Sequence, residues 1–396
     1  MYDRIYLIIM DGVGCGTSKE SEKYGDSGAN TLASVAKANP GLKLPALTRL
    51  GLGNLTGLSL FEQNDYFSSF ITRSDFKSIG KDSTTGHWEI AGLITEADFA
   101  YFPDGFPDDI VNEIIENSDV EGFLGNKAAS GTEIIKELGS KHINSGKPIL
   151  YTSADSVLQI AAHEEHFGLE RLYKLCEICR IIADKHNISR VIARPFIGKT
   201  ARSFKRTTNR HDYAIAPPGK TILNVLSENN VSTASVGKIK DLFNHSGIEK
   251  CYEAHTNPEA YKVLNELAEK FDTERFVFVN LIDFDTLYGH RRDPQAFGQA
   301  LKEFDDFLGK WVTNLHNDTL VILTADHGCD PSFEGTDHTR ECVPLIAISH
   351  NFRKGYVDFK IRCSTSDIAA TIADNFNIKE KSIAGKSFLH ILKSLA

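Results

Sequence analysis

Six aspartate and histidine side chains of this chain are candidate ligands for divalent cations. They come directly or shortly after three apolar segments, and they are Asp11, Asp285, His290, Asp326, His327 and His338. Carboxylate oxygens and imidazole nitrogens together suit Mn²⁺ or Zn²⁺ better than Mg²⁺, which prefers oxygen ligands and keeps its waters. If the fold brings the six side chains together, the sequence predicts a metal site for two ions.

The three apolar segments have the pattern of strands that are buried on both faces. Arg4–Met10, Phe276–Ile282 and Thr319–Leu323 are short, continuous and rich in β-branched and aromatic residues. In open α/β sheets, ligands bind outside the carboxyl ends of the strands. Parallel pairing of the three strands would therefore deliver the candidate ligands to one edge of the sheet. Asp283 points to the opposite face from its neighbours on the strand, so we expect it to be structural.

The overall composition is that of a globular protein. The chain has 396 residues, 41% hydrophobic and 24% charged, which suggests about two domains. A net charge of −9 and an isoelectric point near 5.9 argue against nucleic acid as a partner. No apolar run approaches the ~20 residues of a membrane span. Seven scattered cysteines form no disulfide framework, so we expect a reducing, cytoplasmic location.

Two breaks rich in proline, glycine and acidic residues divide the chain. The first is Tyr101–Asp109 and the second is Ala216–Gly219. They predict a metal-binding catalytic core from residues 1–99 and 217–396, with a smaller cap domain, 100–216, inserted into it. The predicted fold is α/β, with a doubly wound, mostly parallel sheet in the core. Inside the cap, the pattern predicts strands at Pro148–Thr152 and Arg190–Ala193 and a long amphipathic helix over His163–Asp184.

Three consecutive residues with hydroxyl side chains precede a predicted helix in the first segment of the core, residues 1–99. Ser83, Thr84 and Thr85 come just before Gly86. Such residues commonly cap a helix and do nothing more. A hydroxyl at a helix N-terminus can also lie where backbone N–H groups favour a phosphate, and a bound metal can activate it as a nucleophile. The local pattern alone leaves both interpretations open.

Basic residues are concentrated in one loop of the predicted cap. Five cations fall within twelve residues of an acidic chain: Lys199, Arg202, Lys205, Arg206 and Arg210. A solvated loop would explain them, but Arg194 and Lys238 add cations on adjoining segments. Arginines recognise phosphate groups with paired hydrogen bonds, so the second interpretation is a sugar-phosphate site. Asp155, just past a predicted strand, has a carboxylate that could accept sugar hydroxyls.

Several motifs resemble the alkaline phosphatase superfamily and, within it, the phosphopentomutase family. The motifs run in the family's order along essentially the whole chain: DGVG at 11–14, TGHWE at 85–89, DTLYGH at 285–290, DHG at 326–328, DHT at 337–339, YTSADSVLQIAAHE at 151–164 and RTTNRHDY at 206–213.

The resemblance implies a reversible mutase that interconverts ribose 1-phosphate and ribose 5-phosphate, and the 2-deoxyribose pair, in nucleoside catabolism. It implies two manganese ions, with Zn²⁺ or another divalent metal as an alternative, and a phosphoryl group carried on Thr85 through a bisphosphate intermediate. Asp11, Asp326 and His327 would hold one ion, and Asp285, His290 and His338 the other. The residues that would bind the pentose phosphate are Ser153, Asp155, Arg194, Arg210 and Lys238. Both Arg206 and Arg210 match the family's phosphate-binding arginine, and the oligomeric state is not implied.

Three other functions are alternatives for a chain with these metal-ligand candidates. A metal-dependent phosphohydrolase or phosphodiesterase would share the core but let water discharge the phospho-threonine, whereas a mutase must exclude water. A cofactor-independent phosphoglycerate mutase would be expected to carry Ser in place of Thr85 and a different cap. A non-catalytic metal-binding protein would transfer no phosphoryl group.

Overall fold

The computed structural model describes residues 1–55, 60–153, 156–270 and 273–396. The chain forms two compact units, which we call the discontinuous unit (Met1–Ala97 with Pro217–Ala396) and the inserted unit (Asp98–Ala216). Each unit has its own sheet and its own hydrophobic core. Each is therefore described by itself.

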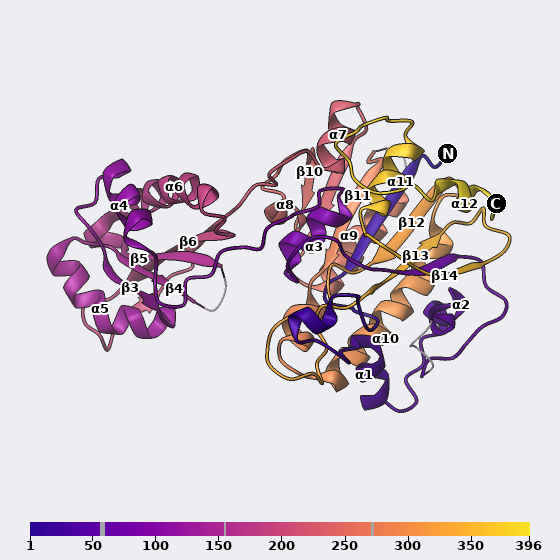
Figure 1. Cartoon of the computed structure of the whole chain (residues 1–396), viewed down its shortest axis with the longest axis horizontal. Helices are drawn as coiled ribbons and strands as arrows, with labels where there is room; N and C mark the ends of the chain where they lie inside the picture. Colours follow the sequence, from indigo (N-terminus) through magenta and orange to yellow (C-terminus); the bar gives the residue numbers. More distant parts are fainter. Residues whose placement is uncertain (56–59, 154–155, 271–272) are drawn as a thin grey trace. The chain divides into compact units, whose positions relative to one another are not determined.

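An eight-stranded sheet forms the centre of the discontinuous unit. Its order is β10 (Lys250–Tyr252), β9 (Thr233–Val236), β11 (Phe276–Leu281), β1 (Arg4–Met10), β12 (Thr319–Thr324), β13 (Val343–Ile348), β2 (Phe70–Ser74) and β14 (Tyr356–Arg362). All neighbours are parallel except that β13 runs antiparallel to β12 and to β2. Figure 1 shows β11, β1 and β12 within this sheet. The predicted α/β class with a mostly parallel sheet is confirmed.

Helices cover both faces of this sheet, because the central strands are apolar on both sides. Val277 and Val279 of β11 belong to a core completed by α1 (Thr31–Ala38), α2 (Pro45–Arg49), α9 (Asn257–Glu269) and α10 (Pro294–Trp311). Phe278, between those two valines, instead contacts Phe243 and His87 on the opposite face. That face carries α3 (Ser83–Ile90), α7 (Ile222–Glu228), α8 (Ile239–Leu242), α11 (Asp367–Asn375) and α12 (Leu389–Lys393). Each fully buried aliphatic side chain contributes roughly 1.5–3 kcal/mol, so the strands that hold the candidate ligands are anchored on both sides.

The inserted unit has its own, smaller α/β fold. Its sheet has the order β3 (Leu124–Ala128), β4 (Ile149–Thr152), β5 (Val157–His163), β6 (Arg190–Ile197) and β7 (Lys205–Arg206), and β8 (His211–Ala214) also pairs with β6. Its helices are α4 (Asp108–Asn117), α5 (Gly131–Ser145) and α6 (Leu169–Lys185). Cys176 and Cys179 on α6 are buried in the core of this unit.

The predicted helix over His163–Asp184 is wrong at its start. His163 ends strand β5, a π-helical turn follows at Glu164–Gly168, and α6 begins only at Leu169. Gly168 has a φ of 95°, and a helix cannot continue through a residue in that conformation. The polar residues at 164–166 therefore belong to a turn between strand and helix.

The remaining helical turns are short: Ser21–Tyr24, Leu52–Asn54 and Val312–Asn314 are 3₁₀ turns, and Phe284–Gly289 is a π-helical turn. Across the described residues, every helix is too short or too polar to cross a membrane.

Candidate metal centre

The discontinuous unit brings all six predicted ligand residues together at the carboxyl ends of three parallel strands. Asp11 follows β1, Asp326 and His327 follow β12, and Asp285 lies in the π-helical turn after β11. Ligand atoms of Asp11, Asp326 and His327 lie within 4.8 Å of one another, as do those of Asp285, His327 and His338. His290 joins the second group, because its Nε2 is 3.0 Å from Nε2 of His338.

The side chains of His290, His327 and His338 all direct Nε2 toward the other candidate ligands. Nδ1 of His290 donates to the carbonyl of Thr336, Nδ1 of His338 to that of Lys81, and Nδ1 of His327 to that of Gly328. Because a carbonyl can only accept, each Nδ1 carries a proton, which leaves Nε2 to face the other ligands. In metal sites, a hydrogen bond from one ring nitrogen orients the other nitrogen in this way. Two Nε2 atoms 3.0 Å apart require a proton or a cation between them.

The carboxylates of Asp11, Asp285 and Asp326 each direct one buried oxygen into the ligand cluster. Asp326 is held through Oδ1, which accepts from the backbone N–H of Gly12 at 3.1 Å, and Asp11 through Oδ2, which accepts from Asn280 at 2.8 Å. The other oxygen of each, and Oδ1 of Asp285, is buried without a hydrogen bond of good geometry. Histidine ring nitrogens lie 3.1–3.5 Å from these oxygens, but burying three carboxylates in one site is costly unless further positive charge is present. Divalent cations would compensate all three at once, so the donor set fits metal ions.

The charges of the site are strongly coupled. Burial, followed by the carboxylates of Asp326 and Asp285, raises the pKa of Asp11 to about 7. Burial alone would raise the pKa of Asp326, but His327 and His87 hold it well below its usual range. Burial would also lower the pKa of His327, but Asp326 outweighs it and raises that pKa to about 10. The site therefore retains protons wherever cations do not replace them.

Two residues that the sequence analysis missed hold the ligands in place. Asn280 on β11 donates to Asp11, and its amide nitrogen is 3.2 Å from Nε2 of His87. Nδ1 of His87 donates to the carbonyl of Ser83 and lies 3.1 Å from Oδ2 of Asp326. Both side chains are fully buried or nearly so. An asparagine inside the otherwise apolar run of β11 was the signal in the sequence that could have indicated this role.

The three hydroxyl residues Ser83, Thr84 and Thr85 lie at the start of α3. This start lies beside the ligand group of Asp11, Asp326 and His327. The N-cap is Asp82, whose side chain accepts from the backbone N–H groups of Thr84 and Thr85, so none of the three hydroxyl residues caps the helix. Ser83 Oγ is 3.0 Å from Nε2 of His327, and Thr85 Oγ1 donates to Oδ2 of Asp82 at 2.8 Å. Thr85 lines a small cavity together with Asp326 and His327.

Gly86 explains how α3 comes so close to the ligands. A Cβ atom on Gly86 would lie 2.1 Å from the backbone oxygen of Asp326. Only glycine therefore lets the first turn of α3 approach the end of β12.

The predicted substrate residues are divided between the two units. Arg194 and Arg210 line a hollow of about 590 Å³ in the inserted unit, together with Lys205 and Arg206. Ser153 is half-buried just past β4, and Asp155 lies outside the described residues. Lys238 belongs to the discontinuous unit, where it acts electrostatically on Asp11. The structure thus gathers the arginines with one another within the inserted unit.

Comparisons with known proteins cover nearly the whole chain. The metalloenzyme superfamily matches residues 3–380. Phosphopentomutase from Clostridium acetobutylicum is 44% identical over 99% of this chain and 100% of its own length, and phosphopentomutase from Syntrophotalea carbinolica is 46% identical over 98% of both chains. This chain belongs to the phosphopentomutase family. A solved phosphoglycerate mutase from Leishmania mexicana is more distant, at 11% identity and a TM-score of 0.49 over 98% of this chain and 97% of that one.

Membership of the phosphopentomutase family makes the chain an enzyme of the mutase type, in the isomerase class. The superfamily match and the clustered ligand side chains indicate that this enzyme depends on divalent metal. The predicted alkaline phosphatase-like fold and the resemblance described above are confirmed at this level.

Metal binding by this phosphopentomutase family member is expected to release protons. With a pKa of about 10, His327 is protonated at pH 7 in the metal-free protein, and a metal ion on Nε2 must displace that proton. Each proton released makes affinity rise by about tenfold per pH unit, so Mn²⁺ affinity should increase from pH 7 to pH 9. Calorimetric titration in buffers of different ionisation enthalpy measures the number of protons directly. Binding that releases no proton and is independent of pH would show that His327 is not a ligand.

Proposed function

We propose that this chain interconverts ribose 1-phosphate and ribose 5-phosphate, and the corresponding 2-deoxyribose phosphates. The proposed route passes through a phospho-threonine at Thr85 and a sugar bisphosphate. Two Mn²⁺ ions would be held, one by Asp11, Asp326 and His327 and the other by Asp285, His290 and His338. Relatives named phosphopentomutase, at 44–46% identity over almost the full length, support the substrate class.

The observation that carries the proposal is the position of the hydroxyl-bearing start of α3 against the ligand cluster. Ser83 Oγ touches His327, and Thr85 lines a cavity with Asp326 and His327. Thr85 is also fixed by its hydrogen bond to Asp82. When bound, two cations stabilise the attacking and leaving oxygens of an in-line phosphoryl transfer.

The residues of the chain account for the remaining steps. The phosphoryl group on Thr85 passes to the free hydroxyl of the sugar monophosphate, which gives the bisphosphate; the bond between Thr85 Oγ1 and phosphorus breaks, and the proton of the sugar hydroxyl ends on Oγ1. The sugar then turns, and its other phosphoryl group passes to Thr85, which leaves the isomeric monophosphate. Asp82, which accepts the hydroxyl hydrogen of Thr85 at 2.8 Å, is placed to take that proton when Thr85 is the attacking group.

We propose that the inserted unit recognises the sugar phosphate. Its hollow is lined by the cations Arg194, Lys205, Arg206 and Arg210, of which Arg210 also forms an ion pair with Asp212, and no acidic residue is among the described residues that line it. Such a surface favours a dianionic phosphate. Ser153, Asp155 and Lys238 would complete the binding of the pentose. Closure of this unit over the substrate would exclude the water that turns a mutase into a phosphatase.

Mass spectrometry of the protein tests the phosphoenzyme. Protein incubated with ribose 1,5-bisphosphate and Mn²⁺ should carry one phosphate, on the peptide that contains residues 81–89, at Thr85. Phosphate at Ser83 or Thr84 instead would reassign the carrier. No covalent phosphate under turnover conditions would count against the route.

Arg210→Ala is expected to weaken the use of ribose 1-phosphate by about ten- to hundredfold, because a charge-assisted contact is worth roughly 1.5–3 kcal/mol. Hydrolysis of a small aryl phosphate, which cannot reach a second phosphate site, should change less. Arg202→Ala is the matched control, since Arg202 is an exposed cation of the same loop outside the lining of the hollow. Steady-state kinetics on both substrates check this. Equal losses on the two substrates would place Arg210 in the fold rather than in substrate recognition.

A further inference from the structure

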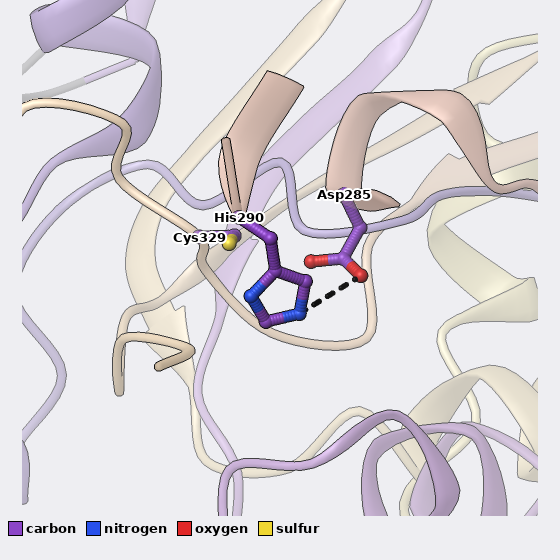
Figure 2. A group of neighbouring side chains, drawn as sticks. All are labelled: Asp285, His290 and Cys329. Atoms are coloured by element: carbon purple, nitrogen blue, oxygen red, sulfur yellow. Dashed lines mark ion pairs between the residues drawn. The ribbon is translucent and has the colours of Figure 1, made fainter. Parts of the chain in front are cut away.

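Cys329 places a sulfur atom beside the second group of ligands. It lies three residues after Asp326, and its Sγ, a carboxylate oxygen of Asp285 and a ring nitrogen of His290 all lie within 4.8 Å of one another. Figure 2 shows these three side chains, with the ion pair between Asp285 and His290. The established family membership assigns no role to this thiol.

The thiol is held in this position by its backbone and by two glycines. The backbone N–H of Cys329 donates to the carbonyl of Gly12 at 2.9 Å, and the residue is fully buried. A Cβ on Gly289 would come within 2.6 Å of Sγ, and one on Gly12 within 3.0 Å of the cysteine Cβ. The space beside Asp285 is thus shaped around the sulfur.

A second observation points to a ligand at the same place. Oδ1 of Asp285 is buried without a hydrogen bond of good geometry, 3.4 Å from Nε2 of His338, and Asp285 is only 3% exposed. His290 keeps Nε2 free of backbone contacts because its Nδ1 donates to Thr336. A carboxylate oxygen, an imidazole nitrogen and a sulfur thus lie within 4.8 Å of one another, which is a donor set typical of Zn²⁺ sites.

We propose that Cys329 is a sulfur ligand for thiophilic divalent cations at the Asp285–His290 group. Zn²⁺, Cd²⁺ and Co²⁺ would bind through Sγ, with loss of the thiol proton to solvent, whereas Mn²⁺ would use the oxygen and imidazole donors. This inference rests on the metal centre of the proposed function. It goes beyond that function because it assigns the binding of thiophilic metals, in contrast to Mn²⁺, to one residue, Cys329.

Cobalt spectroscopy tests the inference without a catalytic assay. Metal-depleted protein titrated with Co²⁺ should develop a sulfur-to-cobalt charge-transfer band in the near ultraviolet. The band should be absent in Cys329→Ser and present in Cys342→Ser, the matched control. Cys342 is a buried free thiol of the same unit, and its Sγ contacts the carbonyl of Thr17, outside the ligand groups.

Competition between metals gives a second measurement. Cys329→Ser should weaken Zn²⁺ binding by about ten- to hundredfold, the scale on which changes around a metal alter its affinity, and should weaken Mn²⁺ binding less. Equal effects on the two metals would contradict the proposal.

The possible outcomes separate this inference from the proposed function. Stoichiometric Co²⁺ binding without the band in the unmodified protein, or a band that survives in Cys329→Ser, would overturn the sulfur ligand and leave the metal centre intact. Failure to bind Co²⁺ at all would count against both. If Cys329→Ser does not fold, the chemical shift of ¹¹³Cd bound to the unmodified protein decides, because sulfur ligation moves it strongly downfield.

Discussion

Replacing Thr85 with Ala is expected to abolish mutase turnover, by roughly four orders of magnitude or more, the scale on which removal of a covalent nucleophile acts. The variant has no hydroxyl to carry the phosphoryl group between the two positions of the sugar. Its fold should be retained, because α3 is capped by Asp82 through backbone N–H groups that the substitution keeps. Its metal content should also be largely retained, because the substitution keeps all six clustered aspartate and histidine side chains. Steady-state kinetics, circular dichroism and elemental analysis of the same preparation check the three expectations.

Ser83→Ala is the informative comparison for this variant. Ser83 Oγ, and not Thr85 Oγ1, is the hydroxyl that contacts His327 in the structure. If Ser83 only supports the metal centre, Ser83→Ala should retain the phosphoenzyme with reduced activity. Retained turnover in Thr85→Ala with loss of the phosphoenzyme in Ser83→Ala would move the nucleophile to Ser83.

Asp326→Ala is expected to remove both metal and catalysis. Asp326 presents a buried oxygen to the site, and its carboxylate also balances the charge of His327. Loss of a partner outside the ligand shell already lowers metal affinity by about ten- to hundredfold, so loss of a ligand should exceed that. Elemental analysis and activity over a range of Mn²⁺ concentrations measure the effect.

Asp337→Ala is the control for that variant. Asp337 is an exposed carboxylate next to His338; it forms an ion pair with Lys81 and accepts from the backbone N–H of His338, but it does not enter the ligand cluster. It should leave metal content close to that of the unmodified protein. Full activity of Asp326→Ala, or of the unmodified protein in excess chelator, would refute a metal-dependent mechanism.

The strands that carry the ligands were predictable because burial on both faces leaves a strong pattern. Every residue of β1, β11 and β12 is buried, and each of these strands appears in the sequence as an apolar run whose interior has one polar residue, Asn280; Arg4, Thr319 and Thr324 lie at strand ends. An aspartate directly after such a run lies at the carboxyl end of a central strand. The convergence of the six side chains follows from parallel pairing, which the apolar runs also indicate.

The features that sequence reasoning missed depend on contacts between distant segments. Asn280 meets His87 across 193 residues, and Cys329 meets Asp285 through a loop whose path no periodicity encodes. Asp82 replaces the hydroxyl residues as the cap because its carboxylate reaches two backbone N–H groups at once. The start of α6 was misplaced because the polar residues at 164–166 suit the first turn of a helix as well as a separate turn, and only the conformation of Gly168 decides.

Phosphorus NMR of ribose 1-phosphate incubated with the protein and Mn²⁺ tests the central claim most directly. The proposed mutase predicts that the ribose 1-phosphate signal is replaced by that of ribose 5-phosphate, with little inorganic phosphate, and that the reaction runs in both directions. Conversion of the substrate to inorganic phosphate, with no ribose 5-phosphate formed, would identify a metal-dependent phosphohydrolase on the same core and contradict the proposal.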